Sequence, residues 1–349
     1  MIYFKRLFLL GFVLFTSACL NVVNSHAEKS ASTQCVEANK WYWPENGKII
    51  QQPNDYLKDI SSKSIILLGE HHDRPEHHRW QLQTIIRLYA FNRNMILGFE
   101  MFPRSVQPVL DRWVAGEIDE DTFLTEVDWQ KNWNFDAKFY LPIFHFARMN
   151  SIPMVAINVD RALVRKVSEK GWENIPQSER ESIKDPAPMS DAYLAFMEDI
   201  YKQHFPHRGS NDKNETNEKE KISDNKKPVK GPEDDHGENT PGESLRDKPE
   251  FQRFIQGQQL WDASMAQGLA QKASKNIFIV GIMGSGHITN GYGVPDQLRA
   301  MDIKDFAMLV PWHDQFKCSD LKPGFSNVVV GMANDVKVVK NKRKPRLGI

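Results

Sequence analysis

Residues 69–78 concentrate side chains that could carry out chemistry. This ten-residue stretch holds four of the chain's eleven histidines, together with two glutamates and one aspartate. It directly follows the apolar run 64–68, which has the length and composition of a buried strand. A second Gly-x-x-His motif, ending at His287, follows another apolar run at 277–280. Two strands that each lead into glycine, two residues and histidine predict one site built from two strand tips.

The residue types at these tips suit a metal ion or an activated water. We expect Gly69 and Gly284 to adopt backbone angles that other residues avoid, so that the chain turns sharply off each strand. Glu100 follows the apolar run 95–99 and adds a carboxylate at the same edge. Histidine nitrogen together with carboxylate oxygen is a ligand set for zinc, iron or manganese. The alternative for the histidines is a loop position that hydrogen-bonds nearby backbone, and for Glu70 a charge at a helix N-terminus.

Short apolar runs recur along the chain, at 64–68, 95–99, 153–157, 276–280 and 306–310. Stretches with helical length and period lie between most of them, at 76–92, 139–150, 191–203 and 251–273. Strands that alternate with helices predict an α/β fold with a mainly parallel sheet and helices on both faces. In such sheets the ligand binds beyond the carboxyl ends of the strands, where both Gly-x-x-His motifs fall.

Residues 207–248 differ in composition from the rest of the chain. Asn, Asp, Glu, Lys, Gly and Pro dominate, and aromatic residues are absent, so this segment cannot bury enough apolar surface to offset the entropy cost of ordering. We predict a disordered insertion within one domain formed by 40–206 and 249–335; a split into two domains is the alternative. The basic tail 336–349 is interpreted as a solvated terminus. Because 45 basic residues balance 45 acidic ones, no overall field favours nucleic acid.

The first 27 residues have the layout of a secretory signal peptide. Lys5 and Arg6 precede a short apolar segment at 7–15. Two cleavage sites compete: a lipobox-like sequence ending at Cys19, whose cysteine would be lipidated, and a signal-peptidase site after Ala27. The residue after the cysteine is leucine rather than aspartate, which favours sorting to the outer membrane of a Gram-negative cell. A soluble periplasmic protein is the alternative.

Export also bears on the other cysteines, Cys35 and Cys318. An oxidising compartment allows these two thiols to pair as a disulfide. The alternative is two unpaired thiols in segments that never meet, and the sequence does not decide between the two.

The chain resembles the ChaN-like haem-binding lipoproteins, within a superfamily that includes the Tiki proteases and relatives of erythromycin esterase. The resemblance covers about residues 55–312 without the insertion, and it rests on four motifs: Gly69-Glu70-x-His72-Asp73 followed by His77-His78, Gly98-Phe99-Glu100-Met101, Trp261-Asp262-x-x-Met265-Ala266, and Gly284-x-Gly286-His287 followed by Gly293-Val294-Pro295. It implies a single Rossmann-like α/β domain, export to the cell envelope and a role in haem or iron acquisition. In the Tiki-like relatives, paired Gly-x-x-His motifs and a glutamate form a metal-dependent hydrolytic site, and His72, Glu100 and His287 occupy the matching positions.

Haem binding would require an iron ligand. Tyr292 lies on a glycine-bounded loop five residues after His287, and tyrosinate ligates ferric haem in some proteins; an ordinary turn tyrosine is the alternative. His77 and His78 are further haem-binding candidates, against a solvated or helix-packing role. The sequence contains no Cys-x-x-Cys-His, which argues against covalent attachment of haem.

The expected helix 251–273 carries Trp261, Asp262 and Met265. Trp261 and Met265 share one face, which is more typical of a core than of a cofactor site. Asp262 is expected to point away from that face.

Two functions of different class use the same crevice. The first, which we favour, is an exported haem- or iron-binding lipoprotein of the cell envelope, anchored to the membrane by lipid and active in haem or iron uptake. The second is a metal-dependent hydrolase in which His72, Glu100 and His287 hold a divalent ion while Glu70 takes a proton from its bound water. An interaction scaffold with a vestigial site is a third interpretation, and a homodimer is left open.

Overall fold

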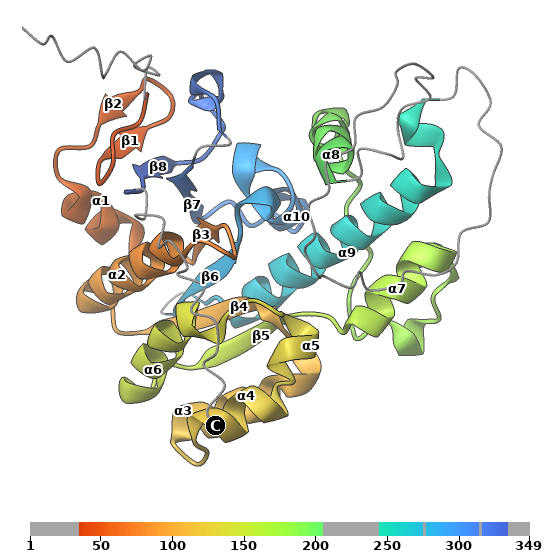
Figure 1. Ribbon diagram of the computed structural model, residues 1–349, viewed down its shortest axis with the longest axis horizontal. Coiled ribbons are helices and arrows are strands. Elements are labelled where there is room, and N and C mark those ends of the chain that lie inside the picture. Colours follow the sequence, from red (N-terminus) through yellow and green to blue (C-terminus); the bar gives the residue numbers. More distant parts are fainter. Residues whose placement is uncertain (1–34, 205–243, 275–276, 314–315, 334–349) are drawn as a thin grey trace, which may run out of the picture. The chain divides into compact units, whose positions relative to one another are not determined.

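In the computed structural model, an eight-stranded sheet organises the described residues, which are 35–204, 244–274, 277–313 and 316–333 (Figure 1). The strands lie in the order β2 (Lys48–Ile49), β1 (Trp41–Trp43), β8 (Val328–Gly331), β7 (Phe306–Trp312), β3 (Ile65–Glu70), β6 (Phe278–Gly284), β4 (Met95–Pro103) and β5 (Met154–Asn158). From β8 to β5 all neighbours are parallel, whereas β1 and β2 add an antiparallel edge.

Parallel pairing brings the carboxyl ends of three strands to one edge of the sheet. β3 pairs with β6 in a register that sets Glu70 opposite Gly284. β4 pairs with the other side of β6, so that its end lies beside the same point. His72 after β3 and His287 after β6 therefore meet Glu100, as the order of polar residues after the apolar runs predicts, although β4 continues to Pro103 and Glu100 lies within it, just beyond its pairing with β6.

Helices cover both faces of the sheet (Figure 1). Ile66 and Leu68 of β3 belong to a core shared with α1 (Pro53–Ile60), α2 (Pro75–Phe91), α3 (Gln107–Ala115), α4 (Glu120–Glu126), α5 (Trp129–Asn132) and α6 (Leu141–Met149). Ile65 and Leu67 face the opposite core, shared with α9 (Pro249–Lys272) and α10 (Val294–Ala300). Both faces are buried, which is why the parallel strands appear in the sequence as continuous apolar runs.

Two further helices pack against α9 through smaller clusters. α7 (Arg161–Lys170) follows β5 and packs through Leu163 and Val167. α8 (Asp191–His204) contributes Tyr193 and Met197 to another cluster. The predicted α/β fold with a mainly parallel sheet is confirmed, and the five apolar runs form β3, β4, β5, β6 and β7.

Several predicted segments lie outside the described residues. They are the signal peptide 1–27, the basic tail 336–349 and most of the insertion 207–248. The last five residues of that insertion, 244–248, are described, and Arg246 among them forms an ion pair with Glu198 of α8. Within the described ranges, no helix is both long enough and apolar enough to span a membrane.

A disulfide joins Cys35 to Cys318, whose Cα atoms are 5.7 Å apart. It connects the segment before β1 to the loop between β7 and β8. The structure therefore shows the first of the two alternatives, in which Cys35 and Cys318 form a disulfide.

Candidate functional site

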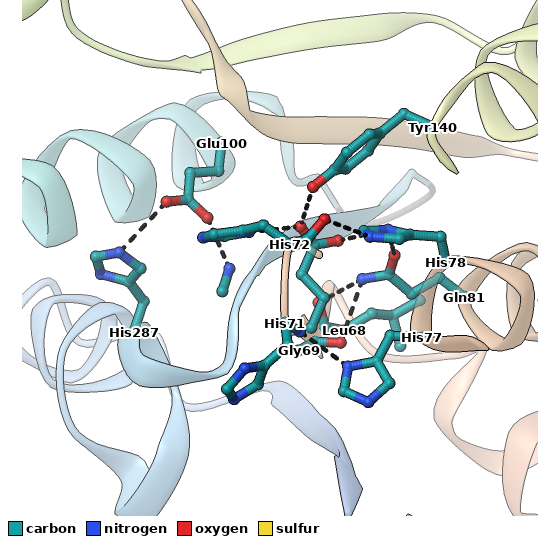
Figure 2. Close-up of polar contacts among 12 residues, drawn as sticks. Leu68, Gly69, His71, His72, His77, His78, Gln81, Glu100, Tyr140 and His287 are labelled. Carbon is teal, nitrogen blue, oxygen red and sulfur yellow. Dashed lines mark hydrogen bonds and ion pairs between the residues drawn. The ribbon is translucent and has the colours of Figure 1, made fainter. Parts of the chain in front are cut away.

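The tip of β3 carries a histidine held by a buried carboxylate. Glu70 is the last residue of β3, and its Oε1 lies 2.8 Å from Nδ1 of His72. Because a carboxylate only accepts, this nitrogen donates the hydrogen bond. The hydroxyl of Tyr140, next to α6, donates to the same oxygen at 2.7 Å. Nε2 of His72 makes no hydrogen bond to any residue that the structure describes, and Figure 2 shows the ring pointing toward Glu100.

His78 and Gln81 of α2 support Glu70 from the other side. Nδ1 of His78 lies 3.1 Å from Oε2 of Glu70 and 3.2 Å from Oε1 of Gln81, so it can donate to either oxygen. Nε2 of Gln81 donates to two carbonyl groups near the end of β3. Burial alone would raise the pKa of Glu70, but the interactions with His78 and His72 outweigh it and hold that pKa well below its usual value. Glu70 is therefore an ionised acceptor that orients His72.

A second histidine is held in a similar way after β6. Nδ1 of His287 lies 2.6 Å from Oδ1 of Asp262 on α9, and the hydroxyl of Tyr193 donates to Oδ2 of the same carboxylate at 2.7 Å. Nε2 of His287 lies 3.4 Å from Oε1 of Glu100 (Figure 2). The backbone amide of Gly284 donates to Oε2 of Glu100 at 2.6 Å. Both ring nitrogens of His287 thus face carboxylates.

These contacts make His287 a cation. Burial alone would lower its pKa, but the charges of Glu100 and Asp262 and the hydrogen bonds to them raise it to about 10. Burial would likewise raise the pKa of Glu100, but His287, His72 and the amide of Gly284 hold it below its usual value. At neutral pH the site contains an imidazolium between two carboxylates.

Gly69 and Gly284 provide space at the strand tips rather than unusual backbone angles. Neither is among the glycines with positive φ, so the expectation of a special turn conformation at these positions is wrong. A Cβ on Gly69 would lie 2.7 Å from Oγ of Ser285, and one on Gly284 would lie 3.0 Å from Cε1 of His72. Glycine allows the two tips and the His72 ring to approach closely.

His72 and His287 both line a cavity of about 280 Å³. Two aromatic rings pack against His72, with centroid distances of 4.5 Å for Trp133 and 5.0 Å for Phe135. The other lining residues, some apolar and some polar, are Glu100, Met101, Pro103, Asn132, Asn158, Val159, Arg161, Gln258 and Trp261. The cavity thus combines aromatic walls with imidazole nitrogens and a single arginine.

Tyr292, His77 and His78 are not among the residues that line this cavity. The half-buried ring of Tyr292 packs beside Tyr193, with centroids 5.3 Å apart. His77 is buried, and its Nδ1 accepts from the amide of His71 at 2.8 Å. His78 supports Glu70 instead. The assignment of Tyr292, His77 and His78 as haem-binding residues stays a prediction.

Three residues of the site are not expected from the sequence. Asp262 is expected only to point away from the face of Trp261 and Met265, which assigns it no role in the site, but the middle of α9 is buried on all sides and the carboxylate meets His287. Tyr140 and Tyr193 lie 70 and 69 residues from the carboxylates that they contact. No local motif marks them, and only the tertiary structure brings them to the site.

His72, Glu100 and His287 meet at the cavity, but they are not arranged as ligands of one ion. His287 directs both nitrogens at carboxylates. Within the described ranges, no group of three or more His, Cys, Asp or Glu residues is placed to hold a metal ion. The expected divalent-metal site therefore finds no support.

Fold and site together define an α/β protein with paired histidines at the carboxyl edge of a parallel sheet. The family model described as "Haem-binding uptake, Tiki superfamily, ChaN" matches residues 56–298. The chain belongs to this family, and its membership supports a role in haem binding. A search of curated proteins found no match.

Solved structures also resemble the chain. One, described as cofacial haem binding to ChaN of Campylobacter jejuni, has a TM-score of 0.60 and 14% sequence identity, and the match covers 84% of this chain and 98% of that one. The type III effector HopBA1 has a TM-score of 0.39 and 11% identity, with 86% and 99% covered. RRSP, a MARTX toxin effector domain from Vibrio vulnificus, has a TM-score of 0.39 and 13% identity, with 82% and 40% covered. The first of these shows the fold.

Proposed function

We propose that the protein binds haem in the cavity at the carboxyl edge of β3, β4 and β6, with His72 as the iron ligand. The observation that supports this is the orientation of His72. Its Nδ1 donates to Glu70, and the edge of the ring that carries Nε2 faces the cavity. Histidines that ligate a metal are commonly held through the other nitrogen by a carboxylate in this way. Family membership points to haem as the ligand.

His287 suits a different role from His72. Its pKa is raised to about 10, and the pKa of His72 is also raised, because the hydrogen bond to Glu70 and the charges of Glu100 and Glu70 outweigh burial, so either ring would have to release a proton to offer a lone pair to iron. In His287 both nitrogens already face carboxylates. It can only donate hydrogen bonds, to Asp262, to Glu100 or to a ligand that enters between them. The His72 side chain is also more exposed, at 28% against 12% for His287.

The walls of the cavity fit a flat, largely apolar cofactor. Trp133, Phe135 and Trp261 offer aromatic surface, and Arg161 offers a guanidinium that can pair with a carboxylate. A tetrapyrrole is wider than the cavity of about 280 Å³, and Phe135 also lines a second cavity of about 410 Å³, so haem binding would require side chains around this ring to move. Haem, when bound, would supply the iron and a planar ring carrying two propionates, and the residues named here would hold it.

The test of this proposal is a haemin titration followed by the Soret band. The wild-type protein should bind haemin, and His72→Ala should weaken binding at least tenfold and change the band. His145→Ala is the comparison variant, because His145 lines neither cavity, although its surface partner Glu120 lines the second one. Tyr292→Phe should leave the band unchanged. If Tyr292→Phe erases the band and His72→Ala preserves it, tyrosine is the ligand and our assignment is wrong.

We also propose that the protein is exported and anchored to the outer membrane by lipid on Cys19, for haem or iron uptake. The signal-like N-terminal sequence supports export, and the disulfide of Cys35 suits an oxidising compartment. In a Gram-negative host fed labelled palmitate, the wild-type chain should carry label in the membrane fraction, and Cys19→Ala should lose it. A Cys19→Ala chain that keeps the label would refute the anchor. A wild-type chain that stays in the cytoplasm would refute export.

A further inference from the structure

We infer that the cavity at the carboxyl edge of β3, β4 and β6 takes a second kind of ligand, a small organic acid with one aromatic ring and one carboxylate. This ligand is additional to the haem of the proposed function, and it fits the cavity in the shape that the structure shows. A cavity of about 150 Å³ can hold benzene, so a cavity of about 280 Å³ has room for one ring and its carboxylate. A tetrapyrrole enters only if side chains move, whereas the smaller acid requires no movement.

Aromatic side chains from two elements supply the surface for the ring. Trp133 and Phe135 follow α5 and pack against each other, with ring centroids 5.6 Å apart. Trp261 of α9 adds a third ring to the lining. Aromatic rings attract one another in offset-stacked or edge-to-face contacts. These walls favour a flat apolar body over a hydrated ion such as phosphate.

A guanidinium without a counter-ion lines the same cavity. Arg161 is the first residue of α7, and its Nη2 donates to the backbone carbonyl of Asn132 at 2.9 Å. This hydrogen bond holds the guanidinium beside the backbone that carries Trp133. Arg161 forms no ion pair with any residue that the structure describes. Its remaining N–H groups can therefore pair with a carboxylate that enters the cavity.

Two groups on α9 add hydrogen-bonding capacity. Gln258 and Trp261 lie one turn apart on this helix, and both line the cavity. The carboxamide of Gln258 and the indole N–H of Trp261 form no hydrogen bond within the described ranges. The indole is a donor only, and the carboxamide can donate as well. Together with Arg161, these groups favour a ligand that carries acceptor oxygens.

Glu100 also lines the cavity, but its charge is already balanced. Its Oε1 lies 3.4 Å from Nε2 of His287, and its Oε2 accepts from the backbone amide of Gly284 at 2.6 Å. His287 is a cation and offsets this carboxylate. The charge of Arg161 is therefore not cancelled by Glu100, and it remains to attract an anion.

The test is a calorimetric titration of the full chain without haemin, with benzoate as the probe. The wild-type protein should bind benzoate, and Arg161→Gln should weaken binding by about fivefold, the upper limit for an exposed ion pair. Arg165→Gln is the matched control, because Arg165 lies one turn further along α7, is exposed and does not line the cavity. Benzyl alcohol keeps the ring without the charge, and inorganic phosphate keeps a charge without the ring. Both should bind more weakly than benzoate.

Several results would overturn the inference. They are a wild-type chain that does not bind benzoate, an affinity that Arg161→Gln and Arg165→Gln change equally or not at all, and binding of benzyl alcohol or phosphate as tight as that of benzoate. The haemin titration decides the proposed function separately. Benzoate binding without haemin binding would remove that function and support the small acid, and haemin binding without benzoate binding would do the reverse.

Discussion

Asp262→Asn is expected to destabilise the protein and to flatten the dependence of its stability on pH. The carboxylate is buried and accepts from both His287 and Tyr193. Asparagine keeps the shape and one acceptor oxygen but removes the charge that faces the imidazolium. His287 then keeps only Glu100 as an ionic partner, at 3.4 Å.

The magnitude follows from the pKa of His287. Its value of about 10 in the folded protein lies above the ordinary 6.5, so its stabilising contribution is fully present below pH 6.5 and is lost as the pH rises toward 10. At about 1.4 kcal/mol per pH unit, this interval corresponds to at most about 5 kcal/mol. Asp262 and Glu100 share that contribution, and burial raises the pKa of Asp262, which offsets part of it, so losing Asp262 should cost about 2 kcal/mol at pH 7, less than the roughly 3 to 5 kcal/mol seen when one partner of a buried pair is removed.

Urea unfolding between pH 7 and pH 9.5 measures both effects. The wild-type protein should lose stability across this range, and Asp262→Asn should start lower and change less. Glu120→Gln is the matched control, because Glu120 pairs with His145 at 2.9 Å but both side chains are more than 40% exposed; it should change stability by less than about 1 kcal/mol. If Asp262→Asn unfolds like the wild type at every pH, the buried pair does not stabilise the protein and the reasoning is refuted.

Three other changes have defined outcomes. Gly284→Ala should weaken haemin binding several-fold because its Cβ would lie 3.0 Å from the His72 ring, whereas Gly286→Ala, with nothing within 4 Å, should bind like the wild type; equal affinities would contradict the packing argument. Cys35→Ser should lower the free energy of unfolding by about 2 to 4 kcal/mol, since the disulfide closes a loop of 283 residues, and urea curves with and without reductant check this. Replacing residues 207–243 by a short Gly-Ser linker should leave the melting temperature nearly unchanged, because loop-closure entropy varies slowly with length; a large fall would show that the segment packs.

The parts of the fold and site that depend on strand order follow from the sequence. Apolar runs predict five of the six parallel strands, all but the four-residue β8, and polar residues directly after three of these runs predict that His72, Glu100 and His287 meet at one edge. The antiparallel edge is not predicted, because β1 and β2 have three and two residues and carry too little periodicity.

The partners of the histidines depend on tertiary packing instead. Helical spacing places Asp262 away from Trp261, but spacing assigns a role only where one helix face is exposed, and the middle of α9 has no such face. Tyr140 reaches Glu70 from the position just before α6, 70 residues away. A buried carboxylate in the sequence indicates that donors are needed, but not which residues supply them.

The hydrogen bonds and ion pairs that the site carboxylates already make favour ligand binding over hydrolysis. Glu100 and Asp262 each have groups at hydrogen-bonding or ion-pair distance from both oxygens, and Glu70 accepts at Oε1 from His72 and Tyr140, whereas its buried Oε2 has Nδ1 of His78 at 3.1 Å but no hydrogen bond among the described residues. A base that activates water would have to give up one of these contacts, at a cost of about 1.5 to 3 kcal/mol for a bond to a charged group. Nε2 of His72, by contrast, makes no hydrogen bond with the residues that the structure describes, although the raised pKa of His72 means that this nitrogen would have to release a proton to bind iron. A site in which most carboxylate oxygens are engaged and His72 is held in place through Nδ1 is suited to keeping a ligand rather than to turning one over.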